Sequence, residues 1–417
     1  MANQRPGTFP ALADLTQDIA GPLPVGLLRD WAAGERTSGN AEELLSPFRK
    51  RGIVVASDTS GLSRLSQERD LLEVLWLVSQ PKQILHAIGT EVGGRAVGIW
   101  VADNTEMFYP PPVTAMTVVD AMIEAQARIA ERAEVRIGLC LHSGVFYEIG
   151  GGLYGGDAQT VEGLAEDHAG PEEILATGEL LKEAGTPDGY SFSRRFDLDT
   201  LHPEGVFSVR GTRRLAGLVE KSFRYPHPFT ADFFAMLRKM KNLAQWAKLK
   251  QQVYDAYQTD RFVVFLARER GARSGENLAA VLDGFMDNAL MAQVVSDAVG
   301  AAEHVAESGG GLAILVFDSG KEALEFAQII RERFRDNNLA VSIGIDRGPV
   351  LLFEKSGGGF EGIVGDPINL SSKLSEDLGR PGKILITGRA GESIGNFAGS
   401  ERFEAAISRV AVSGFVL

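Results

Sequence analysis

The sequence predicts one α/β domain that occurs twice in tandem, and two observations support this fold class. Runs of β-branched and other apolar residues alternate with amphipathic helical stretches, in the order strand, helix, strand pair, helix, strand, glycine-rich loop, helix, strand. The same order returns in the second half of the 417-residue chain, with equivalent segments about 205–210 residues apart. One duplication explains every pair of segments, and the chain is long enough for two domains with a core each.

The composition is typical of a soluble globular protein, with 44% hydrophobic and 23% charged residues and a net charge of −13. A nucleic-acid or anionic-membrane partner is disfavoured, because phosphate contacts need clustered Lys and Arg. The single cysteine, Cys140, lies in an apolar run and has no second thiol for an intrachain disulfide. No apolar stretch is expected to span a membrane and the N-terminus does not resemble a signal peptide, so a cytoplasmic protein is expected.

Residues 1–50 predict a helical N-terminal extension, which is either a packing arm or a partner-binding segment. The first domain is expected over residues 51–215. It opens with the strand GIVVASD and a helix to about Ile88, after which GGRAVGIWVAD is interpreted as a hairpin turn into a strand. An amphipathic helix from about Val113 to Arg132 leads to the strand VRIGLCLHSG, the glycine-rich EIGGGLYGGD, a helix and the strand EEILATG.

A helical connector is expected over residues 216–259, where apolar residues recur at helical spacing as on a packing face. The second domain, over residues 260–417, then repeats the first. FVVFLAR matches GIVVASD, GGGLAILVFDS matches GGRAVGIWVAD, VSIGIDRGPV matches VRIGLCLHSGV, GIVGDPINLSSKLSED matches LYGGDAQTVEGLAED, and GKILITG matches EEILATG. Five pairs in one order indicate a duplication far more strongly than any single pair.

Three of these segments resemble motifs of the class III nucleotide cyclases, the adenylate and guanylate cyclase homology domains. DTSGLSRLS from Asp58 resembles the first-strand metal motif, VRIGLCLHSG and VSIGIDRGPV resemble the strand ending in His-x-Gly, and GDPINLSSKL from Gly365 resembles the Gly-Asp-x-Val-Asn-x-Ala-Ala-Arg-Leu helix start. The resemblance covers roughly residues 50–210 and 260–417. It implies two tandem ferredoxin-like α+β domains that pair head to tail within the chain as a pseudo-dimer.

In that family each catalytic cleft takes two metal-binding Asp residues from one domain. The other domain supplies a base-recognising Lys and Asp, and an Asn and Arg that stabilise the transition state. Cyclisation is a phosphoryl transfer, so carboxylate-held cations and a fixed cationic donor must neutralise the charge that builds on the phosphate oxygens.

By this resemblance the first repeat keeps Asp58 as a metal ligand. The second metal carboxylate should lie in the hairpin before IWVA, where the sequence has Gly94 and no Asp nearby. The Asn and Arg positions of the helix GDAQTVEGLAE are Thr160 and Leu164, and the base-specifying position is Leu153. Leu cannot donate to a phosphate, so this helix is not expected to serve a catalytic cleft.

In the second repeat Arg268 stands at the first metal position, a cation where a cation should bind. The hairpin VAESGGGLA has no Asp or Lys, and the base-specifying position is Gly362. Asn369 is kept, while the Arg position is Lys373, which lacks the bidentate fork of a guanidinium. The best remaining cleft therefore combines Asp58 with Asn369 and Lys373, and the opposite cleft is unsuited to cyclisation.

Simpler roles compete for these residues. Asp58 is interpreted equally well as the cap of a following helix and as a retained ion ligand. Asn369 is interpreted somewhat more readily as a helix cap than as a ligand contact. Asp157 and Asp366 follow glycine in both repeats and are interpreted as structural turn residues. His142, at the His-x-Gly position, is expected to be packed rather than catalytic.

These observations favour a catalytically degenerate, cyclase-like pseudoenzyme that senses a ligand, acts as a scaffold or regulates a protein partner in signal transduction, and that requires no cofactor. The alternative is an active, divergent adenylate or guanylate cyclase that uses Mg²⁺ or Mn²⁺ at the cleft of Asp58, Asn369 and Lys373. A third class is a purely structural interaction protein. A nucleotide or other small ligand and a protein partner are expected, whereas nucleic acid and membrane insertion are not.

Overall fold

The computed structural model describes most of the chain from residue 25 onwards. Residues 1–24, 63–64, 66–67, 99, 101–103, 186, 212–214, 216–224, 228, 230, 240–242, 270–276, 300–304, 310, 355–359, 396, 398 and 408–409 lie outside the described residues.

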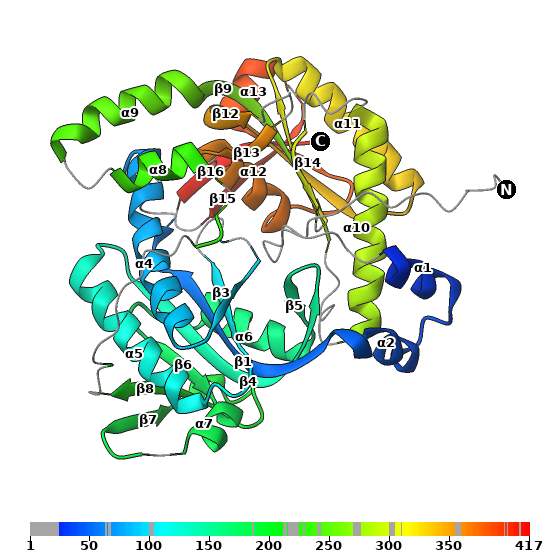
Figure 1. Ribbon diagram of the computed structural model, residues 1–417. Helices are drawn as coiled ribbons and strands as arrows, with labels where there is room; N and C mark the ends of the chain where they lie inside the picture. The colour runs from blue at the N-terminus through cyan, green and yellow to red at the C-terminus, as the bar shows by residue number, and fades with distance from the viewer. Residues whose placement is uncertain are drawn as a thin grey trace.

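The first half of the chain forms an eight-stranded mixed sheet (Figure 1). Its strands lie in the order β2-β3-β1-β4-β6-β8-β7, with β5 paired to β4. Only the β4–β6 pair is parallel among these pairs. The strands are β1 (Arg49–Thr59), β2 (Arg95–Val97), β3 (Thr105–Tyr109), β4 (Ile137–Ile149), β5 (Gly152–Tyr154), β6 (Ile174–Thr177), β7 (Tyr190–Arg194) and β8 (Val206–Gly211).

Helices cover both faces of this sheet. α4 (Leu71–Glu91) and α5 (Ala115–Arg132) lie on one face, α6 (Gly156–Asp167) lies on the other, and α7 (Gly178–Ala184) follows β6. The alternation of side chains along β1 explains both layers, because Val55 joins the core under α4 and α5 while Val54 joins the core under α6. Thr114 caps α5 by accepting from the Thr117 N–H, which sets the beginning of the predicted amphipathic helix.

The second half repeats the same strand order, β10-β11-β9-β12-β14-β16-β15, with β13 paired to β12. Its strands are β9 (Gln258–Arg268), β10 (Val305–Gly309), β11 (Leu312–Phe317), β12 (Val341–Glu354), β13 (Phe360–Val364), β14 (Ile384–Thr387), β15 (Glu401–Ile407) and β16 (Val410–Val416). Its helices are α10 (Leu278–Val299), α11 (Gly320–Asp336), α12 (Asp366–Glu376) and α13 (Gly388–Ile394). The expected mixed α+β architecture with two sheets is confirmed.

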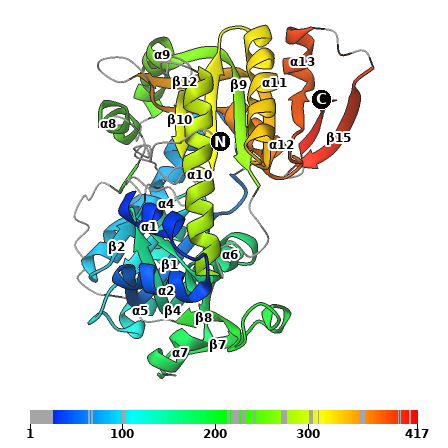
Figure 2. The same ribbon diagram turned by 90° about the vertical axis from the view of Figure 1, so that its right-hand side faces the viewer.

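The described residues of the N-terminal segment pack against α10 of the second half. α1 (Val25–Ala33) and α2 (Ser38–Leu45) lie beside α10 (Figure 2), and the short η2 (Ser46–Phe48) lies between α2 and β1 and contacts β4. Trp31 is fully buried and its indole N–H donates to Asp283 of α10 at 2.9 Å. The β4–β5 hairpin reaches the same cluster, where Tyr154 meets Phe285 edge to face at 4.8 Å between ring centroids.

The predicted connector forms a seam between the two halves. It comprises α8 (Ala231–Lys239) and α9 (Leu243–Tyr257). Phe233 of α8 packs at 4.7 Å from Phe353 of β12, and Trp246 of α9 lies 6.0 Å from Trp76 of α4. One hydrophobic cluster thus joins α4 of the first half with β12 of the second.

Among the described helices, α10 is long and apolar enough to cross a membrane by length and composition, so the expectation that no stretch reaches that length is wrong. Its apolar character has a packing explanation. Leu282 and Phe285 face the N-terminal arm, while Met291 and Val295 face the core of the second sheet. A helix that is covered on two sides by different elements needs apolar residues on both.

The edge of the first sheet differs from the predicted one. GGRAVGIWVAD was interpreted as a turn followed by a strand; among its described residues Arg95–Val97 form a strand, and the partner of that strand is Thr105–Tyr109. The matching of GGGLAILVFDS with GGRAVGIWVAD is therefore also wrong, because β11 corresponds to β3. Trp100 lies in the connection, where its indole N–H donates to the carbonyls of Val97 and Glu106, both at 3.2 Å. Its apolar side chain is buried as an anchor and not as part of a strand.

Candidate functional site

The corrected hairpin changes where the second metal carboxylate should be sought. β2 pairs with β3 and the connection between them spans residues 98–104, so Gly94 precedes β2 and does not lie in this connection. Gly94 is unsuited to any ligand, because a Cβ there would lie 2.4 Å from the Tyr109 ring. The connection contains Asp103 in its sequence, although residues 101–103 lie outside the described residues. The expectation that the first half has lost its second metal carboxylate stays a prediction.

Strand register shows which residues of the two halves correspond. Leu139 of β4 pairs with the first residue of β6, and Ile343 of β12 pairs with the first residue of β14, so Leu139 and Ile343 are equivalent. On the other side Leu139 pairs with Ser57 of β1, and Ile343 pairs with Leu266 of β9. The next residues are Asp58 and Ala267, so the counterpart of Asp58 is Ala267 and not Arg268.

Arg268 serves the packing of its own half. Its Nε donates to Asn288 of α10 at 2.9 Å, and its guanidinium lies 3.6 Å from the Asp287 carboxylate. Its backbone N–H donates to the carbonyl of Gly311, at the end of the β10–β11 hairpin. The guanidinium therefore links the end of β9 to α10.

The first-half positions that correspond to catalytic groups point into the protein. Leu164 is 3% exposed and Leu153 is fully buried, and both belong to the core between α6 and the sheet. Thr160 donates its hydroxyl to the carbonyl of Gly156, one turn earlier in α6. Buried leucines cannot contact a nucleotide, in agreement with the expectation from the sequence.

The second-half positions lie on the first two turns of α12. The N-cap of this helix is Gly365, so the interpretation of Asn369 as its cap is wrong, and the Asn369 side chain is exposed. Lys373 is half-buried, with its Nζ 3.7 Å from the Asp377 carboxylate. Asp58 lies at the far end of β1, opposite Gly138 of β4. That these three side chains share a cleft stays a prediction.

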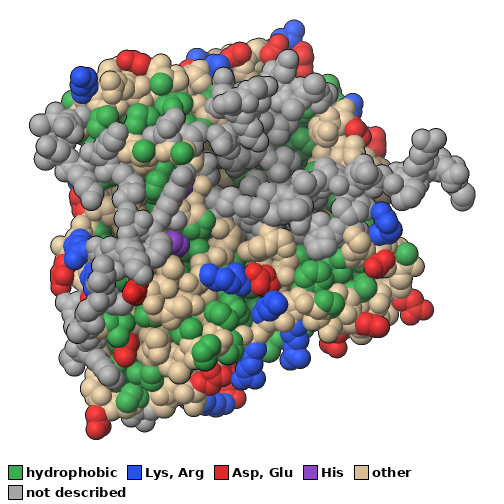
Figure 3. Space-filling model, viewed as in Figure 1, with side chains coloured by type: hydrophobic (Ala, Val, Ile, Leu, Met, Phe, Trp, Pro, Cys, Tyr) green, Lys and Arg blue, Asp and Glu red, His purple; other side chains and the backbone are tan. Residues whose placement is uncertain are grey.

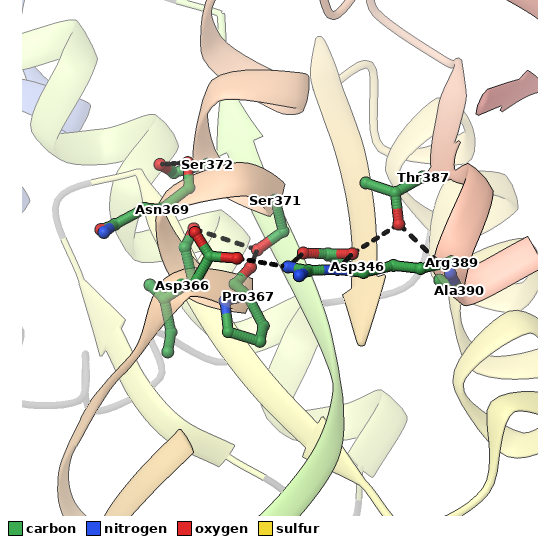
Figure 4. Close-up of polar contacts among 10 residues, drawn as sticks. Asp346, Asp366, Pro367, Asn369, Ser371, Ser372, Thr387, Arg389 and Ala390 are labelled. Atoms are coloured by element: carbon green, nitrogen blue, oxygen red, sulfur yellow. Dashed lines mark hydrogen bonds and ion pairs between the residues drawn. The ribbon is translucent and has the colours of Figure 1, made fainter. Parts of the chain in front are cut away.

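A polar cluster that sequence reasoning missed lies behind α12 (Figure 4). Asp346 of β12 is fully buried and accepts hydrogen bonds from Thr387 at 2.5 Å and from Arg389 Nε at 2.8 Å. Arg389 also contacts Asp366 at 2.7 Å, while Asn369 points away from the cluster. Burial raises the pKa of Asp346, and the two donors oppose that rise. One guanidinium thus serves two carboxylates.

The first half has a histidine where the second has Asp346. His142 lies three residues after Leu139 of β4, and Asp346 lies three residues after Ile343 of β12. Leu139 and Ile343 are equivalent, because each pairs with the first residue of the parallel strand, β6 or β14. His142 is 2% exposed, and its Nδ1 lies 2.8 Å from the hydroxyl of Thr177. Its Nε2 is 3.3 Å from Asp157, which also accepts from the Val145 N–H at 2.6 Å. His142 is therefore packed, as expected, but among polar groups.

The visible surface carries charges of both signs. On the face seen in Figure 3, Lys and Arg side chains are interspersed with Asp and Glu side chains over the described residues.

No family model matches the sequence, and no curated protein matches it. Solved structures that are similar include a class III adenylyl cyclase-like ATP-binding protein from Pseudomonas aeruginosa, with 14% identity, a TM-score of 0.47, and 83% of this chain and 85% of that chain covered. Two others are the guanylyl cyclase Cya2, at 16% identity and a TM-score of 0.33, and the adenylyl cyclase CyaB from P. aeruginosa, at 19% and 0.33. Each of these matches covers 98% of that protein and 42% or 40% of this chain. At these values the similarity concerns the course of the chain alone.

Proposed function

We propose that this chain is a regulatory or ligand-sensing protein that binds a nucleoside triphosphate with a divalent cation at one site and does not cyclise it. The site would combine Asp58 at the end of β1 with Asn369 and Lys373 of α12. The non-catalytic role is supported by Lys373, which stands where the resemblance to cyclases expects an arginine. Lys373 cannot form the two parallel hydrogen bonds of a guanidinium, and its ammonium already has Asp377 as a neighbour.

The charge requirement of the reaction supports this proposal. The phosphate oxygens of a cyclising nucleotide gain charge, and catalysis depends on donors that are fixed before the reaction begins. A flexible ammonium that shares its charge with a carboxylate one turn along the helix is a weak substitute. It is still adequate for holding a phosphate in the ground state.

The proposal restricts binding to one site of the two that a domain pair would offer. The opposite site would need Leu164 and Leu153, which are both in the core of the first half. A stoichiometry of one nucleotide per chain is therefore expected.

The alternative is an active, divergent cyclase, and Asp103 favours it. If Asp103 stands beside Asp58, the first half would offer two carboxylates to Mg²⁺ or Mn²⁺, as the resemblance to class III cyclases requires. Metal-assisted cyclisation would then depend on both carboxylates.

The test measures binding and turnover with the same full-length preparation. Calorimetry with ATP or GTP and Mg²⁺ or Mn²⁺ is expected to give one binding site, and chromatography is expected to show no cyclic nucleotide. Asp58→Asn should weaken metal-dependent binding about tenfold or more, because one carboxylate ligand is lost, whereas an equal effect of Asp103→Asn is expected only for the alternative. Asp188→Asn, at an exposed position of the first half, is the matched control.

Two results would change the assignment. Formation of a cyclic nucleotide that both Asp58→Asn and Asp103→Asn abolish would establish the active cyclase. Absence of nucleotide binding under every metal condition would leave the structural interaction protein as the remaining class.

A further inference from the structure

We infer that the first half of the chain holds a transition-metal site of the kind that takes Zn²⁺, built from His142, Glu179 and His202. One ligand atom from each of these residues lies within 4.8 Å of the others. The inference goes beyond the proposed function, because neither nucleotide nor cyclase chemistry involves these residues.

Three separate elements bring the ligands together. His142 is in the middle of the central strand β4, and Glu179 is in the first turn of α7, directly after β6. His202 follows the short η3 helix (Phe196–Leu198) and precedes β8. Because β6 lies between β4 and β8 in the sheet, ligands from all three neighbourhoods converge at one end of β6 (Figure 1).

One polar atom on each of these three side chains lacks a hydrogen-bond partner among the described residues, although Glu179 Oε2 lies 3.2 Å from His202 Nε2 and His142 Nε2 lies 3.3 Å from Asp157 Oδ1. His142 is 2% exposed and His202 is 6% exposed. His142 Nε2, His202 Nδ1 and Glu179 Oε2 are buried atoms that make no hydrogen bond within the described part of the chain. A buried polar atom without a partner costs about 1–3 kcal/mol, so several of them in one place indicate a missing ligand.

The histidine beneath the site is oriented by Thr177. His142 Nδ1 lies 2.8 Å from the Thr177 hydroxyl, and in the tautomer that carries the proton on Nδ1 the Nε2 atom offers a lone pair to a cation. Metal-bound histidines in proteins are usually held in this way through the second ring nitrogen.

One pair of ligand atoms has the spacing expected around a tetrahedral cation. Zn²⁺ lies about 2.0–2.1 Å from nitrogen ligands, which sets neighbouring ligand atoms about 3.4 Å apart. His202 Nε2 is 3.2 Å from Glu179 Oε2, and the His142 ligand atom lies within 4.8 Å of the ligand atoms of both. Asp157 contacts His142 Nε2 at 3.3 Å but does not belong to this group of three. The side chains of Glu179 and Asp157 are 35% and 40% exposed, which opens the site to solvent on the carboxylate side.

In the second half, the region equivalent to this group contains the positive charge of Arg389. There the residues equivalent to Asp157 and His142 are Asp366 and Asp346, and Arg389 neutralises both carboxylates. Glu179 takes the place of Arg389, since each is the second residue after the threonine that ends the parallel strand. The first half therefore has carboxylates without the guanidinium, and a divalent cation would supply the positive charge that Arg389 supplies in the other half.

The test uses the full-length chain without a histidine tag, after treatment with a chelator. Zn²⁺ titrated by calorimetry is expected to bind one per chain, and Co²⁺ should give the visible absorption of a tetrahedral complex. Glu179→Gln and His202→Gln each remove one ligand and should weaken binding at least about 100-fold. His168→Gln, at a half-buried histidine outside the cluster, should leave binding unchanged.

A further variant separates a metal site from simple packing. Thr177→Val keeps every ligand and removes only the group that orients His142, so about tenfold weaker binding is expected. Circular dichroism confirms that each variant is folded. Absence of stoichiometric binding by the wild-type chain, or binding that Glu179→Gln and His202→Gln leave unchanged, would overturn the inference. Because only metal is added, the result is independent of nucleotide binding.

Discussion

Replacing Arg389 by methionine tests the account of the buried cluster in the second half. Asp346 is fully buried and takes two of its hydrogen bonds from this guanidinium. Removing one partner of a buried ion pair costs about 3–5 kcal/mol. We expect the lower end, about 3 kcal/mol, because the Arg389 side chain is 43% exposed and water can replace part of it. For a domain of this size that corresponds to a melting temperature about 6–12 °C lower.

The pH dependence of this variant has a defined sign. Without Arg389, only the hydrogen bonds from Thr387 and from the Arg347 backbone oppose burial, so the pKa of Asp346 rises further above the unfolded value of about 3.9. A carboxyl with a raised folded-state pKa contributes its stability in full below the unfolded pKa and loses it as the pH rises through the folded pKa. The difference in the free energy of unfolding between the wild type and Arg389→Met should therefore become smaller as the pH falls from 7 towards 4.

Urea denaturation measures the effect, and a neighbouring ion pair provides the control. Arg347 contacts Asp260 at 2.9 Å, and both side chains are more than 40% exposed. Arg347→Met should therefore cost less than about 1 kcal/mol. The double variant Asp346→Asn/Arg389→Met should recover most of the loss, because no buried charge remains. Equal destabilisation by Arg389→Met and Arg347→Met would refute the reasoning.

Three further predictions concern the core. Phe353→Ala should lower the free energy of unfolding by about 3–5 kcal/mol in urea titrations, because this ring is 1% exposed and fills the seam against α8 and α9. Cys140 should react with a thiol reagent at pH 8 only as fast as the sheet opens, since burial raises the pKa of this thiol; rapid labelling of the native protein would contradict this. Glu173→Gln should cost about 1–2 kcal/mol at pH 7. Burial raises the pKa of Glu173, but its hydrogen bonds, including those from Arg195 at 2.7 and 2.8 Å, outweigh burial, so the pKa of Glu173 in the folded protein is lowered. The stability that the Glu173 carboxylate contributes is therefore lost as the pH falls below about 4 and through this folded-state pKa, and the cost of Glu173→Gln should disappear there.

Local patterns in the sequence were sufficient for most of the elements. The helix that ends at Arg132 and the strand that contains His142 were predicted because the spacing of apolar residues along the sequence reflects which side chains are buried in each element. The edge hairpin was misplaced because Trp100 and its apolar neighbours look more like a strand than TEMFY does. An apolar run shows that side chains are buried, but not whether their backbone pairs with a sheet.

The candidate site depended more heavily on pairing. Asp58 was found from its motif, but its counterpart was assigned to Arg268, one residue away from the correct position in the register. In a strand a shift of one residue moves a side chain to the other face, so an alignment without pairing cannot settle which residue replaces which. The β2–β3 pairing likewise shows that Asp103 belongs to the connection between these two strands, which the sequence pattern did not indicate.

The sequence by itself determined that the chain contains one α/β pattern twice, that its cores are apolar on the predicted faces, and that the second copy keeps Asn369 and Lys373. These are local properties of composition and spacing. The tertiary structure decided which side chains meet across the sheets. His142, Glu179 and His202 are separated by up to 60 residues in the chain, yet they converge because β6 is held between β4 and β8. Contacts of this kind follow from strand order and register, which short-range patterns do not contain.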